Sequence, residues 1–274
     1  MKRTPIIIAA TVVVAAALVA GLWWVSRPRA PEAATAPPRE TVAQAPASPA
    51  SAPAEPAIRH PIDAAQVDRG AAPLDFQGAL DGLFGARTVA SMFLVDDFAR
   101  RFVATVDNLG RSSASSRLWP VVPATGRFSV ADAEGGAAIG AANAARYEPF
   151  LRLLEEVDLH RAAAAYVQLY PSLQRAYEEL GYPKRYFNDR FVDVIDVLLA
   201  TPEPASPPKV HLPTVNGPVQ PQRPWVLYEF DDPQLESLTA GQKILLRMGV
   251  RNERRVKAKL VELRGLIAAT PAQR

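Results

Sequence analysis

The sequence predicts a mainly α-helical, all-α domain behind a single N-terminal transmembrane helix. Three observations support this fold class: an uncharged apolar run at 6–25, a proline- and alanine-rich stretch at 26–72, and apolar residues that recur every three or four positions across 73–267. Strand patterns are rare, so we expect at most one small β-hairpin. Residues 1–5 are then a short cytoplasmic N-terminus, and 268–274 are a tail.

The apolar run reads IIIAATVVVAAALVAGLWWV and contains no charge. A helix of this length spans about 30 Å, which is the hydrocarbon thickness of a bilayer. Trp23 and Trp24 close the run, where aromatic side chains prefer the headgroup region. A cleaved signal peptide has a shorter apolar core, so we expect an uncleaved signal anchor in the lipid bilayer. The flanking charges favour a single pass with the N-terminus in the cytoplasm and the rest of the chain on the far side of the membrane.

Residues 26–72 are dominated by alanine and proline and contain no aromatic residue. Such a stretch cannot bury enough apolar surface to offset its ordering entropy. We therefore expect a disordered tether that holds the domain away from the membrane, or a linker with no length requirement. A second proline-rich stretch, 201–224, is expected to be a long loop inside the domain.

The helical repeats can be read in order along the domain. Asp75 and Gly85 delimit a helix over 76–84, and Asp96 and Asp97 are expected to begin a helix over 95–109. Further helices are predicted around Phe150–Val157 with Pro149 in the first turn, over 166–180 with a kink or break at Pro171, over 187–198 before Pro202, and from Thr239 to Met248. Gly249 is expected to separate this helix from a last one, in which Val256, Leu260, Leu263 and Ile267 line one side.

Strand signals are confined to two places. Phe128–Val130 and Ala137–Ile139 flank Glu134-Gly135-Gly136 and predict one hairpin. Val226–Glu229 is expected to add a short extended piece. The glycine spacing at 135–140 does not match a dinucleotide-binding loop.

Composition excludes several classes of function. Without cysteine the chain has no disulfide, no thiolate zinc site and no cysteine nucleophile. The net charge is +3, but residues 73–274 hold 24 Lys/Arg against 23 Asp/Glu, so the domain lacks the basic footprint of a nucleic-acid binder. The recognised motifs of zinc proteases, serine hydrolases and P-loop proteins are absent. We expect no cofactor and, on balance, no enzyme.

Several segments together resemble the bacterial domain-of-unknown-function family 3014, which is uncharacterised: RFVATVDNL (101–109), ARYEPF (145–150), LYPSLQRAYEELGYP (169–183), FNDRFVDVIDVLLATP (187–202), VLYEFDDPQLESLTAGQKILLRMG (226–249) and RVKAKLVELR (255–264). The resemblance covers about residues 75–265. It implies a membrane-anchored envelope protein of proteobacteria, and with the topology above this predicts a single pass through the bacterial inner membrane with the C-terminal domain in the periplasm. The resemblance supplies no activity or catalytic residue. The loop at 110–117 and the insert at 203–223 depart from the family, so neither is expected to carry a shared site.

The polar residues of these segments are candidates for a ligand or partner site: Arg101, Asn108, Arg146, Tyr147, Asn188, Arg190, Glu229 and Lys243, with Asp107, Asp189 and Tyr228 beside them. Many fall at helix ends, where side chains can cap backbone groups. A buried polar network that fixes helix packing is the leading interpretation, and a ligand groove is the alternative.

Two charged clusters have more specific readings. Asp189, Asp193 and Asp196 lie on one helix face and could hold Mg²⁺ or Ca²⁺, although ion pairs with Arg190 or Lys243 are expected and no metal site is assigned. The basic residues of the last helix, Arg251, Arg254, Arg255, Lys257 and Lys259, indicate an anionic partner or a solvated face.

The sequence thus predicts a membrane-anchored binding or scaffolding protein of the bacterial envelope whose partner is an envelope protein or cell-wall polymer. The alternative is an envelope hydrolase that uses Glu229, Asp189 and Asp193. The sequence does not predict the biochemical activity or the oligomeric state of the protein.

Overall fold

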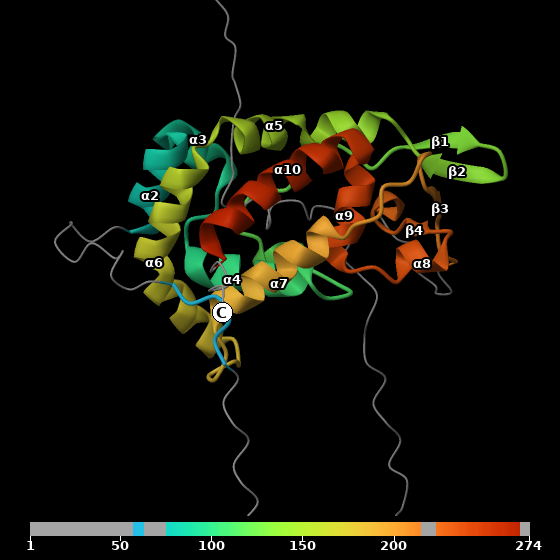
Figure 1. Ribbon diagram of the computed structural model, residues 1–274. Helices are drawn as coiled ribbons and strands as arrows, with labels where there is room; N and C mark the ends of the chain where they lie inside the picture. Colours follow the sequence, from blue (N-terminus) through green and yellow to red (C-terminus); the bar gives the residue numbers. More distant parts are fainter. Residues whose placement is uncertain (1–56, 63–74, 215–222, 269–274) are drawn as a thin grey trace, which may run out of the picture.

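The computed structural model describes residues 57–62, 75–214 and 223–268, which form a helical domain with a small sheet at one end (Figure 1). The predicted membrane segment 6–25 and most of the predicted tether lie outside these residues. Within the described residues, no helix combines the length and apolar character needed to cross a bilayer.

Nine α-helices lie within the described residues: α2 (Phe76–Phe84), α3 (Ala86–Met92), α4 (Phe98–Leu109), α5 (Ala142–Glu156), α6 (Leu159–Glu179), α7 (Phe187–Leu199), α8 (Pro233–Glu236), α9 (Ala240–Met248) and α10 (Val250–Ile267). Short 3-10 turns occur at Ser116–Leu118 and Pro224–Val226. Figure 1 shows α10 crossing the middle of the domain, and it packs against α5, α6, α7 and α9. The predicted helical fold class is confirmed.

Helix ends follow the capping residues in the sequence. The Asp75 carboxylate accepts a hydrogen bond from the Gly78 amide at the start of α2, and Gly85 ends this helix. Thr239 and Gln242 form a capping box at α9, and Gly249, with φ of 83°, separates α9 from α10. These predicted boundaries are confirmed.

Two helix predictions are wrong in detail, and of the two alternatives predicted at Pro171 the break does not occur. The helix expected at 95 begins at Phe98, and Asp97 has φ of 55° and no capping hydrogen bond from its side chain. Pro149 lies inside α5, because buried Asn143 and Tyr147 extend that helix upstream. Pro171 lies inside α6, which continues through it as one helix. Tertiary packing on both sides holds these segments helical despite the missing amide donor.

The sheet is larger than the predicted hairpin. It is antiparallel with strand order β1 (Val130–Ala133), β2 (Gly136–Ile139), β3 (Lys209–His211) and β4 (Glu229–Phe230). The hairpin is confirmed, but its first strand begins at Val130 rather than Phe128. β3 lies within the stretch predicted as a loop, and the extended piece begins only at Glu229.

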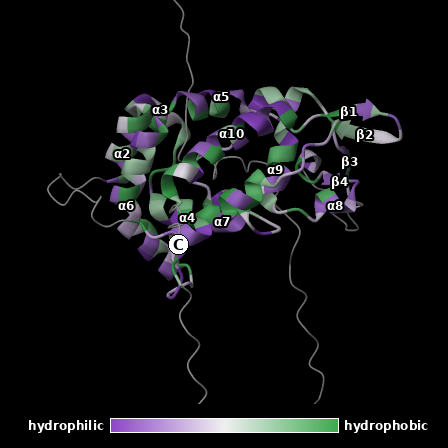
Figure 2. Cartoon of the chain, in the orientation of Figure 1, coloured by the Kyte–Doolittle hydropathy of each residue, from purple (hydrophilic) through white to green (hydrophobic). Residues whose placement is uncertain are grey.

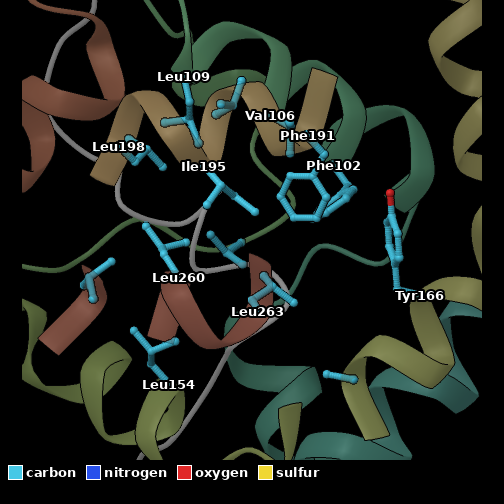
Figure 3. Close-up of a cluster of buried hydrophobic side chains, with 14 of the residues drawn as sticks. Phe102, Val106, Leu109, Leu154, Tyr166, Phe191, Ile195, Leu198, Leu260 and Leu263 are labelled. Carbon is cyan, nitrogen blue, oxygen red and sulfur yellow. The ribbon is translucent and has the colours of Figure 1, made fainter. Parts of the chain in front are cut away.

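Two apolar clusters hold the domain together. The larger contains residues from each of the helices α2 through α7 and from α9 and α10. Figure 3 shows part of it, with Phe102 beside Phe191 and with Leu260 and Leu263 nearby. The Phe102 and Phe191 rings pack edge to face with centroids 5.7 Å apart. The smaller cluster packs the sheet on α9 through Ile139, Val210, Phe230 and Leu246. Figure 2 shows hydrophobic and hydrophilic residues on each long helix, as this packing requires.

Candidate functional site

A buried carboxylate on α4 organises the charged end of the domain. Asp107 is 5% exposed, and its carboxylate accepts hydrogen bonds from Arg111, Arg190 and the Tyr182 hydroxyl. The Arg111 guanidinium also contacts the Tyr182 hydroxyl. The hydrogen bonds to Asp107 raise the pKa of Arg111, so this guanidinium stays charged. Two arginines and a tyrosine are thereby fixed on one buried anion.

Residues 57–62 lie against the start of α7, and we call this segment the strap (Figure 1). The Asp189 carboxylate accepts hydrogen bonds from the backbone amides of Arg59 and His60, the latter at 2.7 Å. The Arg59 guanidinium lies 2.7 Å from the Asp193 carboxylate. The Ile62 amide donates to the Tyr186 hydroxyl at 2.8 Å. This part of the predicted tether is therefore docked on the domain.

Asn188 connects the strap to α6 and to the end of α10. It is fully buried, and its side-chain amide nitrogen donates to the carbonyl oxygens of His60 and Ile267 at 2.8 and 2.9 Å. Its side-chain oxygen accepts from the Tyr166 hydroxyl at 3.0 Å. Burial raises the pKa of Tyr166 well above its usual value, so this hydroxyl keeps the proton it donates.

An open pocket of about 480 Å³ lies between the strap, α4, α7 and the segment that joins α6 to α7. Its charged lining comes from separated parts of the chain: Arg59, Asp107, Arg111, Arg185, Asp189, Arg190 and Asp193. Tyr177, Tyr182 and Tyr186 supply aromatic surface, and Ala57 completes one edge. Four cations against three anions leave the pocket slightly positive. The exposed Arg185 guanidinium has no ion-pair partner among the described residues.

The free energy gained by the hydrogen bonds of the strap is close to the entropy cost of ordering its residues. Ordering a residue costs about 1–2 kcal/mol of backbone entropy. A hydrogen bond returns about 0.5–1.5 kcal/mol net, and about 1.5–3 kcal/mol when one partner is charged. The bonds to Asp189, Asp193, Tyr186 and Asn188 are thus of the same order as the cost of ordering six residues. Ile58 is 54% exposed, so it adds little apolar burial, whereas Ile62 packs partly against the core.

Other candidate residues bind backbone groups and fix loops. Arg101 donates to the carbonyl oxygens of Asp96 and Arg117 at 3.0 and 2.9 Å. Arg146 donates to the Thr125 carbonyl oxygen at 3.1 Å. Tyr147 is buried, which raises its pKa. The Asn108 carbonyl oxygen accepts the capping bonds that end α4.

The remaining candidates lie at the sheet end of the domain, away from the pocket (Figure 1). Lys243 is buried and donates to the Glu236 carboxylate at 2.6 Å. Glu229 pairs with His211 in the β3–β4 register. The Tyr228 carbonyl oxygen accepts from Arg247 at 2.9 Å, a buried arginine that the sequence analysis did not identify. Burial lowers the pKa of Arg247 to about 10.

The three aspartates of α7 are divided between two arginines, Arg59 and Arg264. Asp189 and Asp193 hold the strap, and Asp196 binds Arg264 of α10 at 2.5 Å. The expected ion pairs therefore exist with Arg59 and Arg264 in place of Arg190 and Lys243. Within the described residues, no cluster of three or more carboxylate or imidazole side chains is arranged to hold a metal ion.

The basic residues of α10 are largely neutralised across the domain. Arg255 lies between Glu148 and Glu155 of α5, at 2.8 and 2.7 Å. Arg254 and Lys257 both bind Glu203, and Lys259 binds Glu262. Since most of these cations already have partners, the face offers little free charge to an anionic partner.

Sequence reasoning missed several pocket residues: Arg59, Arg111, Tyr182, Arg185 and Tyr186. Arg111 lies in the loop that departs from the family, and Arg59 lies in the predicted tether. A usable signal existed in the tether: IRHPI interrupts its alanines and prolines with two isoleucines, an arginine and a histidine. Such local change in composition is typical of a segment that contacts a folded surface.

The fold and the pocket define a helical domain with a charged surface site that a tether segment partly covers. The family model "Protein of unknown function (DUF3014)" matches residues 98–264, more than half of the chain, and the protein belongs to this family. No curated protein and no solved structure matches the chain significantly. The match includes α4 and α7, whereas the strap lies outside it.

Proposed function

We propose that the protein is a membrane-anchored binding protein of the bacterial envelope, and that the charged pocket is where its helical domain meets a partner. The apolar run at 6–25 supplies the anchor, and the tether carries the domain into the periplasm. The envelope location is what the resemblance to this family implies. The observation that carries the proposal is the pocket itself.

The chemistry of the pocket suits a protein segment. Both aspartates and arginines line it, so it offers acceptors for peptide amides and donors for carboxylates. The tyrosine rings add area that can pack against aliphatic side chains. The pocket's lining charges nearly cancel, which disfavours a purely anionic polymer as the partner. We therefore favour an envelope protein over a cell-wall polymer.

Site-specific photocrosslinking in intact cells tests this proposal. A crosslinking amino acid replaces Arg185 at the rim of the pocket, and a matched control carries it at Val261, which is 60% exposed on α10. We expect one reproducible adduct from position 185 that is absent from position 261. Equal adducts at both positions, or none at 185 in cells and membranes, would contradict the proposal.

The location needs its own measurement. In spheroplasts, added protease should digest the domain, since the proposed topology places it outside the cytoplasmic membrane. A protected domain would place it in the cytoplasm and overturn the envelope assignment.

The alternative, an envelope hydrolase using Glu229, Asp189 and Asp193, has less support. Asp189 and Asp193 already bind the strap, and Glu229 belongs to β4 at the opposite end of the domain (Figure 1). Assays of the full chain on cell-wall fragments, with Asp189→Ala and Glu229→Ala as controls, would detect such an activity. Turnover that both changes abolish without loss of fold would favour the hydrolase.

A further inference from the structure

We propose that the strap is a built-in competitor, and that its docking site on α7 accepts an extended segment of a partner protein that carries an arginine and a nearby carboxylate. This inference rests on the proposed binding function and names the ligand class and the regulation of the same pocket.

The strap is held chiefly through main-chain groups, which any extended peptide also has. Asp189 accepts two successive backbone amides, and Asn188 donates to the carbonyl oxygen of the second residue, His60. Recognition of main-chain groups gives affinity without demanding one sequence. The start of α7 is therefore built to hold an extended chain.

Two side chains of the strap define the specificity of the site. The Arg59 guanidinium binds Asp193, and Ile62 packs against the core three residues later. Arg59 is nevertheless 55% exposed, so its ion pair is partly screened by water. A partner segment with the same arginine-to-aliphatic spacing can make these contacts in its place.

The pocket extends beyond what the strap uses. Ala57 and Arg59 are the only strap residues in its lining, and Tyr182 and Arg185 are among the residues that line the part beyond the strap. Because Arg185 has no ion-pair partner among the described residues, a carboxylate on the partner segment would complete the charge balance. The chain itself has Glu55 close before the strap, so a peptide with the sequence of residues 55–62 contains both charges.

A peptide titration on the full chain in detergent micelles tests the inference. The probe is a fluorescent peptide with the sequence of residues 55–62, and a control peptide carries Arg59→Ala. The proteins are the wild type, Arg59→Ala, and the double variant Arg59→Ala with Asp189→Asn. Thermal melts confirm that each protein is folded, and Asp193→Asn, whose side chain is 43% exposed, replaces Asp189→Asn if the latter unfolds.

Weakening the strap of the protein should tighten binding of the free probe. If the strap is docked for about nine-tenths of the time, its full release would tighten probe binding about tenfold. The Arg59→Ala protein loses the ion pair and keeps the main-chain contacts, so it should bind the probe more tightly than the wild type by up to about tenfold. The aspartate change should abolish the gain. The control peptide keeps the main-chain contacts and lacks the ion pair with Asp193, so it should bind each folded protein more weakly than the probe does.

Equal affinity of wild type and Arg59→Ala, or no binding by Arg59→Ala, would overturn the inference. So would binding that survives the aspartate change, or probe-independent self-association of the chain at these concentrations, which would make a second copy the occupant. Probe binding needs no cellular partner, so it is independent of the crosslinking result. Failure of crosslinking alone would refute the proposed function.

Discussion

Arg190 of α7 binds Asp107 of α4 at two points. Its Nε lies 2.8 Å from the Asp107 carboxylate, and one terminal nitrogen lies 2.6 Å from the Asp107 carbonyl oxygen. The pair joins two helices whose residues are 83 positions apart in the sequence. Gly110 makes room for it, because a Cβ there would lie 2.9 Å from the Arg190 guanidinium. The Arg190–Asp107 pair, which lines the pocket, therefore also holds α4 and α7 together.

Removal of the buried anion should destabilise the domain. We expect Asp107→Asn to lower the free energy of unfolding by about 2–3 kcal/mol, because Arg111 and Arg190 lose the carboxylate that they bind. The expected loss is smaller than for a fully buried ion pair, because part of the Arg190 side chain contacts water. Urea unfolding followed by circular dichroism measures the change. The control Arg152→Ala breaks an exposed pair with Glu148 and should stay within about 0.5 kcal/mol of wild type. Equal losses would contradict this account.

Gly241 permits a close approach between α9 and its neighbours. A Cβ at this position would lie 2.5 Å from a methyl carbon of Leu198 and 3.0 Å from the Leu109 carbonyl oxygen. Gly241→Ala should therefore cost about 1–3 kcal/mol through overpacking. Gly82→Ala is the matched control, because no atom lies within 4 Å of its Cβ position, and it should stabilise α2 by about 0.5–1 kcal/mol. Thermal melts of the two variants should shift in opposite directions.

How much of this was readable in the sequence depends on the kind of contact. Asp75, Thr239 and Gly249 act within a few residues of their position, so local rules predicted the ends of α2, α9 and α10. The stripe through Phe187, Phe191 and Ile195 likewise predicted the buried face of α7. Local signals of this kind determine most of the helical architecture.

Long-range pairing was not readable. β3 has three residues in a proline-rich stretch, and its strand character depends on partners in β2 and β4. Asp189 looked like a potential cation ligand, yet its partners are the amides of a segment about 130 residues away. Sequence periodicity identified the acidic face of α7, but only the fold shows that the strap occupies it.

Glu253 should make the free energy of unfolding fall as the pH rises. Its side chain is fully buried in α10, and burial raises its pKa above the ordinary value of 4.5, although Lys257 lies 2.8 Å away. The folded chain therefore retains a proton that the unfolded chain loses, and this contribution falls as pH rises above 4.5. Glu253→Gln should gain stability relative to wild type over that range in a pH series of urea unfolding. The exposed control Glu262→Gln should show no such trend.

The ion pairs of Arg255 should make the free energy of unfolding fall as the pH is lowered. Its hydrogen bonds lower the pKa of Glu148 and Glu155 below their ordinary value of 4.5. The unfolded chain then binds more protons below this pH, so the stabilisation is present above 4.5 and is lost as pH falls through the lower folded values. Arg255→Gln should remove this acid-dependent part of the unfolding curve. An unchanged acid profile in the variant would show that the α5–α10 pairs carry none of it.

Hydrogen exchange of the Arg59 and His60 backbone amides in the full chain tests strap docking most directly. If Asp189 holds these amides, they should exchange more slowly than free peptide in the wild type and speed up in Asp189→Asn, while core amides of α7 such as that of Ile195 stay protected. Free-peptide exchange rates at both positions in the wild type would show that the strap is not docked and would contradict the site described above.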